Sequence, residues 1–288
     1  MGFIHLHVHS HYSLLDGAIK VGDIVRMAVE LGMPAIAITD HGNMFGAMEF
    51  YVEAKATGIK PIIGCELYVA RRSRFDRDPK LDADPDHLIV LVMDERGYKN
   101  LMKLTSIGHL EGYYYKPRVD KEVLSEYSDG LIAMSSCIKG EIPRLVISGD
   151  MDKARKALAE YIDIFGKDRF FLEIQRHGIE EEEIAIRGYE ELSRDFGLRM
   201  IATNDVHYLL REHSRAHEIL LCIQTQTTIS DPGRFRFKTD QFHFRTEEEM
   251  REVFRDLPEA LDATLDVAEM CDLELDLSKV YLPEYRPP

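Results

Sequence analysis

The chain has no long apolar run and little positive charge for its size. No apolar stretch in its 288 residues reaches the roughly 18 residues that a membrane-spanning helix requires, and its start, MGFIHLHVHS, lacks the features of a secretory signal. Its 36 basic residues stand against 51 acidic ones, a formal net charge of −15. Since proteins that bind nucleic acid over their whole surface are usually basic, such binding is expected only where cations cluster or bound metal ions reverse the local field.

Cysteine is also scarce. The four cysteines, Cys65, Cys137, Cys222 and Cys271, are far apart and form no C-x-x-C pair, which argues against a disulfide framework and a zinc ribbon. The same scarcity indicates a reducing compartment, so we expect a cytoplasmic protein without a membrane partner. No G-x-G-x-x-G turn follows the first apolar run, which disfavours a dinucleotide-binding fold.

Seven short runs rich in Ile, Val, Leu or Phe alternate with amphipathic helical patterns. The predicted strands are residues 4–9, 34–39, 60–69, 87–93, 130–136, 169–174 and 199–204. Helical candidates between them include residues 21–32, 44–58, 95–110 and 152–166. This alternation predicts an α/β fold of parallel βα units, arranged as an open doubly wound sheet or a closed barrel.

The last quarter of the chain departs from this alternation. Residues 225–245 predict a long loop or hairpin, and residues 246–271 predict a pair of helices. The proline-containing C-terminal end, LPEYRPP, predicts an extended linker. We therefore expect one domain over residues 1–275, followed by a linker over residues 276–288.

Side chains of the metal-ligating types stand at the ends of the predicted strands. His7 and His9 close the first strand and share a face, because strand residues two apart point the same way. Sites in parallel α/β folds form where the carboxyl ends of strands open onto loops, so the pattern predicts a metal cluster there. Only His87 fits poorly, because it stands at the start of its strand. The further candidates are Asp16, Asp40, His41, Glu66, Cys137, Asp205 and His207.

The donors combine imidazole, carboxylate and thiolate groups. Roughly nine donors are too many for one ion, and at about four to six donors per ion they predict two or three divalent ions. Such a mixture suits zinc, manganese or iron, and its carboxylates also suit magnesium. Multi-metal sites of this kind are typical of phosphoester hydrolysis.

Several other residues allow more than one interpretation. Asp40 either orients His41 or acts as a general base. Arg176 and His177 end the sixth predicted strand and are candidates to bind a substrate phosphate. Both are therefore included with Asp40 among the predicted catalytic residues.

Two segments combine aromatic and basic residues. Tyr113, Tyr114 and Tyr115 stand beside Lys116 and Arg118 in GYYYKPR, and the segment at 234–238 reads RFRFK. Aromatic rings among cations can stack nucleobases and hold phosphates, but an ordinary surface loop has the same composition.

Three further histidines favour structural interpretations. His5 shares the face of the first strand's ligands one layer deeper, so we expect it in the barrel core. His213 and His217 are four residues apart, as in a helical zinc pair, but they lack the accompanying glutamate of such motifs. They are expected on a solvated helix face.

The motifs HLHVHS, ITDHG, PIIGCE and TNDVH resemble those of the polymerase and histidinol phosphatase (PHP) superfamily. Longer segments, including SLLDG, ITDHGNMFGAMEFY, GLIAMSSCIKGEIP and VYLPEYRPP, resemble the PHP domains of the alpha subunits of bacterial DNA polymerase III over essentially the whole chain. The resemblance implies a distorted seven-stranded (β/α) barrel, a metal site at the strand C-terminal face, and a linker that leads into a polymerase palm domain.

The resemblance also implies a trinuclear metal site and an activity. That activity is metal-dependent 3′–5′ exonuclease action in proofreading, with a DNA 3′ end and the rest of the polymerase chain as partners. Two alternatives stay open: a scaffold that stabilises the polymerase and docks a separate proofreading exonuclease, and a phosphatase for small molecules. The implied ligands are His7, His9, Asp16, His41, Glu66, His87, Cys137, Asp205 and His207.

Overall fold

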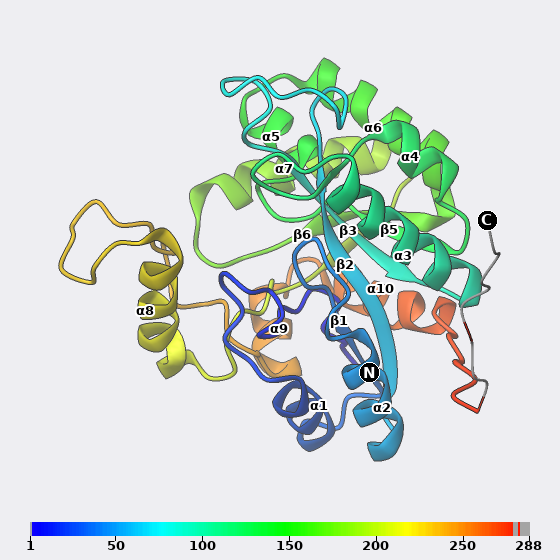
Figure 1. Cartoon of the computed structure of the whole chain (residues 1–288), viewed down its shortest axis with the longest axis vertical. Helices are drawn as coiled ribbons and strands as arrows, with labels where there is room; N and C mark the ends of the chain where they lie inside the picture. The colour runs from blue at the N-terminus through cyan, green and yellow to red at the C-terminus, as the bar shows by residue number, and fades with distance from the viewer. Residues whose placement is uncertain (1, 279–281, 283–288) are drawn as a thin grey trace, which may run out of the picture.

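A curled β-sheet with helices packed around it forms the centre of the computed structural model, which describes residues 2–278 and 282 (Figure 1). Six predicted strands are confirmed to within two residues at each end. The strand order is β1-β2-β3-β5-β6-β7, with a short β4 paired to β2. The strands are β1 (Ala35–Ile38), β2 (Lys60–Val69), β3 (Asp86–Val92), β4 (Arg118–Val119), β5 (Leu131–Met134), β6 (Phe170–Ile174) and β7 (Met200–Ala202).

The N-terminal apolar segment joins the two ends of this sheet. Its carbonyl groups accept hydrogen bonds from the backbone amides of Ala37 in β1 and Thr39 just beyond it, at 3.1 and 2.8 Å. On the other side, Val206 accepts from the amide of His9 at 2.8 Å and donates to the carbonyl of His7 at 3.0 Å. The segment forms only an isolated bridge rather than the predicted strand, but it closes the sheet into a distorted (β/α) barrel.

The sheet is mixed, so the prediction of uniformly parallel units is wrong for one strand. β3 runs antiparallel to both β2 and β5, whereas β1–β2, β5–β6 and β6–β7 are parallel pairs. No helix connects β2 to β3, so the crossover that a parallel pair requires is missing. The start of β3 therefore lies beside the end of β2, with His87 opposite Tyr68. This reversal brings His87 to the rim that carries the other predicted ligands.

Helices surround the sheet, and α8 stands apart from it beside a long loop at residues 226–246 (Figure 1). In the described part of the chain, no helix is long and apolar enough to cross a membrane. The predicted helices are confirmed as α1 (Val21–Glu30), α2 (Ala47–Thr57), α3 (Glu95–Leu110), α6 (Met151–Phe165), α9 (Glu247–Val253) and α10 (Pro258–Met270). The helix expected at His213 and His217 is confirmed as α8 (Ser214–Thr225), and three further helices were given no predicted range: α4 (Lys121–Glu126), α5 (Glu141–Ile147) and α7 (Glu180–Phe196). The predicted linker lies mostly outside the described residues.

Apolar side chains pack on both faces of the sheet. Along β3, Ile89 and Leu91 belong to a buried cluster that includes Val267 of α10, whereas Val90 belongs to a larger cluster with Leu101 of α3. Neighbouring residues of a strand point to opposite faces, so this alternation buries the strand completely. Buried polar side chains within the strands, such as Glu66 and Glu173, are therefore exceptions to this pattern.

Arg118 is fully buried in β4, which corrects the suggestion that it binds phosphate. Its guanidinium donates hydrogen bonds to four backbone carbonyl groups in the loops around it. These belong to Gly112 at 3.0 Å, Arg74 at 3.0 Å, Asp76 at 2.8 Å and Asp82 at 3.1 Å. Arg118 thus fastens the connection between β2 and β3 to the body of the barrel.

Replacing Arg118 by methionine is expected to lower the free energy of unfolding by about 3 kcal/mol, because four buried carbonyl groups lose their donors. Arg118→Lys should recover only part of this loss, because an ammonium lacks the planar fork of a guanidinium. Urea unfolding followed by circular dichroism measures both changes. Arg236→Met, at an exposed position, is the control and should stay within about 0.5 kcal/mol of the wild type. A wild-type midpoint for Arg118→Met would contradict the assigned role.

Candidate metal centre

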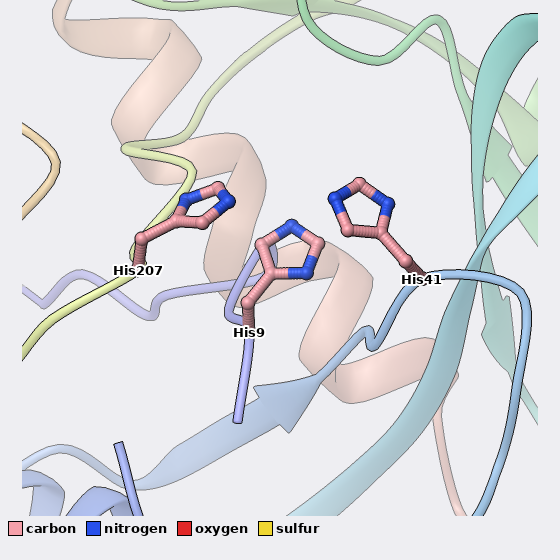
Figure 2. Close-up of side chains that lie close together, drawn as sticks. All are labelled: His9, His41 and His207. Carbon is pink, nitrogen blue, oxygen red and sulfur yellow. The ribbon is translucent and has the colours of Figure 1, made fainter. Parts of the chain in front are cut away.

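Seven of the nine predicted ligands lie together at the barrel rim. Three overlapping subsets each have donor atoms within 4.8 Å of one another. The ring of His9 lies between those of His41 and His207, with centroids 4.3 Å from each (Figure 2). These rings come from the N-terminal segment, the loop after β1 and the segment after β7, respectively. The seven residues are His7, His9, His41, Glu66, His87, Asp205 and His207.

The tightest part of the cluster joins two imidazoles to two carboxylates. Nε2 of His7 lies 3.0 Å from Nε2 of His9, and both nitrogens lie 3.0–3.1 Å from Oε2 of Glu66 and Oδ1 of Asp205. Burial opposes protonation of His9, but hydrogen bonds to the two carboxylates raise its pKa to about 10. Burial also opposes ionisation of Asp205, yet the nearby His7 and His207 hold its pKa well below the ordinary value. The ionised carboxylates of Glu66 and Asp205 therefore favour a positively charged partner at this point.

Glu66 connects this group to a second one. Its Oε2 faces His7 and His9, whereas its Oε1 lies 2.7 Å from Nδ1 of His87 and accepts a hydrogen bond from Ser136 at 2.9 Å. The glutamate comes from the middle of the apolar strand β2 and is almost completely buried. A carboxylate with donors on both oxygens is suited to bridge two cations.

Asp16 and Cys137 lie next to the cluster and stay predicted ligands. Oδ2 of Asp16 is 3.4 Å from Nε2 of His41, and despite burial this histidine holds the pKa of Asp16 far below its usual value. Burial raises the pKa of the Cys137 thiol well above its usual value, and the charges of Glu66 and Asp205 act in the same direction. A nearby cation would be needed to favour the thiolate.

Buried polar atoms without hydrogen-bond partners test whether this site suits metal ions. Among the described residues they include Oδ1 of Asp16 and Nδ1 of His41, both at the cluster. Leaving such atoms unpaired is costly, and ionised carboxylates inside a protein require a cation. Imidazole and carboxylate donors in this number fit divalent metal ions of the borderline class.

Glu173 of β6 holds His7 in place and was missed as a functional residue. Its Oε1 lies 2.7 Å from Nδ1 of His7 and accepts further hydrogen bonds from Thr203 at 2.5 Å and Gln175 at 3.0 Å. Histidines that bind metals commonly donate their second N–H group to a carboxylate in this way. The sequence does contain a signal for it, a glutamate within the apolar strand FFLEI. Glu66 was identified from the same kind of position.

Replacing Glu173 by glutamine is expected to weaken metal binding about 10- to 100-fold, because His7 loses the carboxylate that orients it. Competition with a chromophoric chelator measures the affinity, and a melting curve of the metal-free protein checks the fold. Glu180→Gln, at the exposed start of α7, is the matched control. Unchanged affinity in Glu173→Gln would show that His7 does not depend on this carboxylate.

Asp40 supports the cluster from behind, and its action as a general base stays a prediction. Its carboxylate accepts hydrogen bonds from the amide and hydroxyl groups of Ser10, at 2.7 and 2.8 Å, and from the hydroxyl of Ser13 at 2.9 Å. Oγ of Ser13 in turn lies 2.8 Å from Nδ1 of His9 and accepts from the backbone amide of His41. Of the two interpretations of Asp40, orientation of the cluster fits these contacts.

Arg176 and His177 are both held by partners within the protein. The guanidinium of Arg176 pairs with Glu183 at 2.8 Å and Asp256 at 2.5 Å. His177 is buried. Its Nδ1 lies 2.5 Å from Oε1 of Glu182, and its Nε2 lies 3.0 Å from the backbone carbonyl oxygen of Asn204. These contacts give both residues a structural role, and the phosphate contact of each stays a prediction.

The other histidines divide between the core and the surface. His5 is buried in the core, as predicted, and its Nε2 lies 2.8 Å from the carbonyl oxygen of Arg245. His213 is exposed, but His217 is buried, and its Nε2 lies 2.8 Å from the carbonyl oxygen of Asp16. The predicted solvated face is therefore wrong for His217, which supports the loop of a predicted ligand.

Comparison with known proteins identifies the family to which the chain is similar. The PHP domain family model matches residues 5–177. The DNA polymerase III subunit alpha of Borreliella burgdorferi is 48% identical over 288 residues, covering 99% of this chain and 25% of the relative. That of Thermus aquaticus is 49% identical over 285 residues, covering 96% of this chain and 23% of the relative. The chain thus spans about a quarter of the length of these relatives.

Solved structures show more distant likeness. An amidohydrolase from Chromobacterium violaceum has a TM-score of 0.47 and 15% identity, covering 72% of this chain and 88% of its own. A two-domain protein from Bacteroides vulgatus, described as containing a predicted PHP-like metal-dependent phosphoesterase, has a TM-score of 0.40 and 17% identity, with coverages of 71% and 52%. Because the family model covers more than half of the chain, the chain belongs to the PHP domain family.

Proposed function

We propose that this domain hydrolyses phosphodiester bonds at the 3′ end of DNA, with two or three divalent metal ions held at the barrel rim. One observation carries the proposal. His7 and His9 place two imidazole nitrogens within 3.1 Å of carboxylate oxygens from Glu66 and Asp205, in a buried position. Such convergence is unfavourable without a cation, and it matches the donor chemistry of hydrolytic metal sites.

The residues of the cluster would divide the ions between them. His7, His9 and Asp205 would hold one ion together with Glu66, and His41 and His87 would hold another together with the same glutamate. Bound divalent ions lower the pKa of water and stabilise the charges that develop on the phosphate. The protein fixes the donors beforehand: Glu173 orients His7, while Ser13 links His9 to the backbone and to Asp40.

The relatives suggest the setting of this activity. The proposed partners are a DNA 3′ end, the remainder of a polymerase chain reached through the linker at residues 276–288, and a proofreading exonuclease subunit. The proposed location is the cytoplasm, and the proposed metals are zinc, manganese, iron or magnesium. Positive ions at the rim would let a chain with a net charge of −15 accept an anionic strand.

A digestion assay tests the proposal. The purified domain is given zinc or manganese and a single-stranded oligonucleotide labelled near its 3′ end, in parallel with p-nitrophenyl phosphate. Stepwise loss of nucleotides from the 3′ end with little monoester hydrolysis is the expected result. Faster turnover of the monoester would favour a phosphatase, and no hydrolysis of either substrate by the metal-loaded domain would favour a scaffold.

A further inference from the structure

A cavity of about 230 Å³ opens beside the metal centre. It lies between the loop that carries Asp16, the loop after β1 and the turn around residues 113–117. Asp16 and His41 form part of its wall, so its occupant would contact residues of the predicted metal centre. The wall also includes Phe45, Tyr68, His109, Tyr113, Tyr115 and Lys116.

Exposed aromatic rings line this cavity. Phe45, Tyr113 and Tyr115 are 60%, 54% and 64% exposed although they line a concave surface. The ring of His109 stacks at 6.3 Å against Tyr113 and lies 6.4 Å from Phe45. Single exposed aromatic residues are common, but a group of them around one hollow marks a binding site. Planar heteroaromatic rings are the ligands that such faces stack against.

Lys116 contributes an ammonium group to the wall of the cavity. Its Nζ lies 5.3 Å from the ring centroid of Tyr68, and that ring stacks at 5.6 Å on the ring of His41. Among the described residues, no carboxylate lies within ion-pair distance of Lys116. The neighbouring Arg118 is, by contrast, fully used by backbone carbonyl groups. The ammonium group of Lys116 is thus available to bind an anion. The ring of Tyr68 separates it from His41 of the metal centre.

The backbone of Tyr115 gives an independent indication. Its φ is 58°, in the left-handed region that is unfavourable for a bulky side chain and easy for glycine. The turn is closed by a hydrogen bond of 3.0 Å from the amide of Tyr114 to the carbonyl of Lys116. Glycine would form this turn with less strain, so backbone geometry does not explain the tyrosine. Such strain is characteristic of positions where the side chain has a function.

We propose that this cavity binds the last nucleotide of a single-stranded 3′ end, with the base against Tyr113 and Tyr115 and a phosphate on Lys116. This inference rests on the proposed function and adds a substrate class to it. The volume lies below the usual range of ligand pockets, about 300–1,000 Å³, which suits a single base better than a base pair. An unpaired terminus is therefore the preferred substrate.

Binding measurements test the subsite separately from catalysis. The probe is a fluorescein-labelled, single-stranded thymidine octamer with a phosphorothioate at its last linkage to slow cleavage, followed by fluorescence anisotropy with metal present. A second probe lacks only the 3′-terminal base. Tyr115→Gly should weaken binding of the complete probe about 5- to 150-fold and leave binding of the probe without that base unchanged. Its melting temperature should equal or exceed that of the wild type, because glycine relieves the turn.

Two further variants complete the test. Lys116→Met should weaken both probes by the same factor, because it removes a phosphate contact. Phe235→Ala, at an exposed ring outside the cavity, should bind both probes as the wild type does.

Two results would overturn the subsite: wild-type affinity in Tyr115→Gly, or a comparable loss in Phe235→Ala, which would place the strand on the loop at residues 226–246. A wild-type domain that binds the probes as expected but never cleaves an ordinary oligonucleotide would refute the proposed function and keep the subsite.

Discussion

Replacing His9 or Asp205 by alanine is expected to reduce 3′ excision by at least about 100-fold, even with metal in excess. The two side chains approach each other from the N-terminal segment and from beyond β7, and Nε2 of His9 lies 3.1 Å from Oδ1 of Asp205. Loss of either donor leaves the remaining ligands free to shift. A displacement of about 1 Å in a reacting group costs on the order of 100-fold in rate.

The measurement is the initial rate of nucleotide release from a 3′-labelled oligonucleotide. Circular dichroism should show an intact fold in both variants, because the strands and helices do not depend on one donor. His213→Ala is the matched control, since this histidine is exposed at the start of α8, and it should retain the wild-type rate. Full excision by both His9→Ala and Asp205→Ala would show that another enzyme in the preparation is responsible.

Removing the metal ions should lower the melting temperature by on the order of 10 °C. Glu66 and Asp205 are buried carboxylates, with Asp16 close by, and cations that bind only the folded chain stabilise it. An ion present at 100 times its dissociation constant adds about 2.7 kcal/mol, and two ions would add about twice that. For a domain of this size each kcal/mol shifts the melting temperature by roughly 2–4 °C.

Calorimetry with and without a chelator, followed by return of zinc or manganese, measures this change. The melting temperature should recover when the metal is returned. Glu66→Gln should be much less sensitive to the chelator, because the residue that connects the two donor groups has lost its charge. Identical melting curves in the presence and absence of chelator would refute a buried multi-metal centre.

Local patterns in the sequence were sufficient for much of the fold. Runs of branched and aromatic residues predicted β1 through β7, apart from the two-residue β4, because a fully buried strand must be apolar throughout. Spacing also placed His7 and His9 on one face, and their Nε2 atoms lie 3.0 Å apart. In both cases the cause is local, since alternation along an extended chain needs no distant partner.

Contacts with partners far along the chain could not be predicted from the sequence. Arg118 and Arg176 carry guanidinium groups, which commonly bind phosphate. Only the folded chain shows that these two groups already bind partners within the protein. Glu173 was missed for the same reason, because it lies 166 residues from the histidine that it orients. A side chain's charge is local information, whereas its neighbour is decided by tertiary packing.

The sequence by itself determined which residues could bind metal ions and which segments would form the sheet. The tertiary structure alone decided the direction of β3, which brings His87 to within 2.7 Å of Glu66, and the closure of the barrel by the N-terminal segment. Side chains alternate in the same way whether a strand runs parallel or antiparallel to its neighbour, so the apolar pattern carries no direction. Direction follows from the connection between strands and from the hydrogen bonds that the assembled sheet can form.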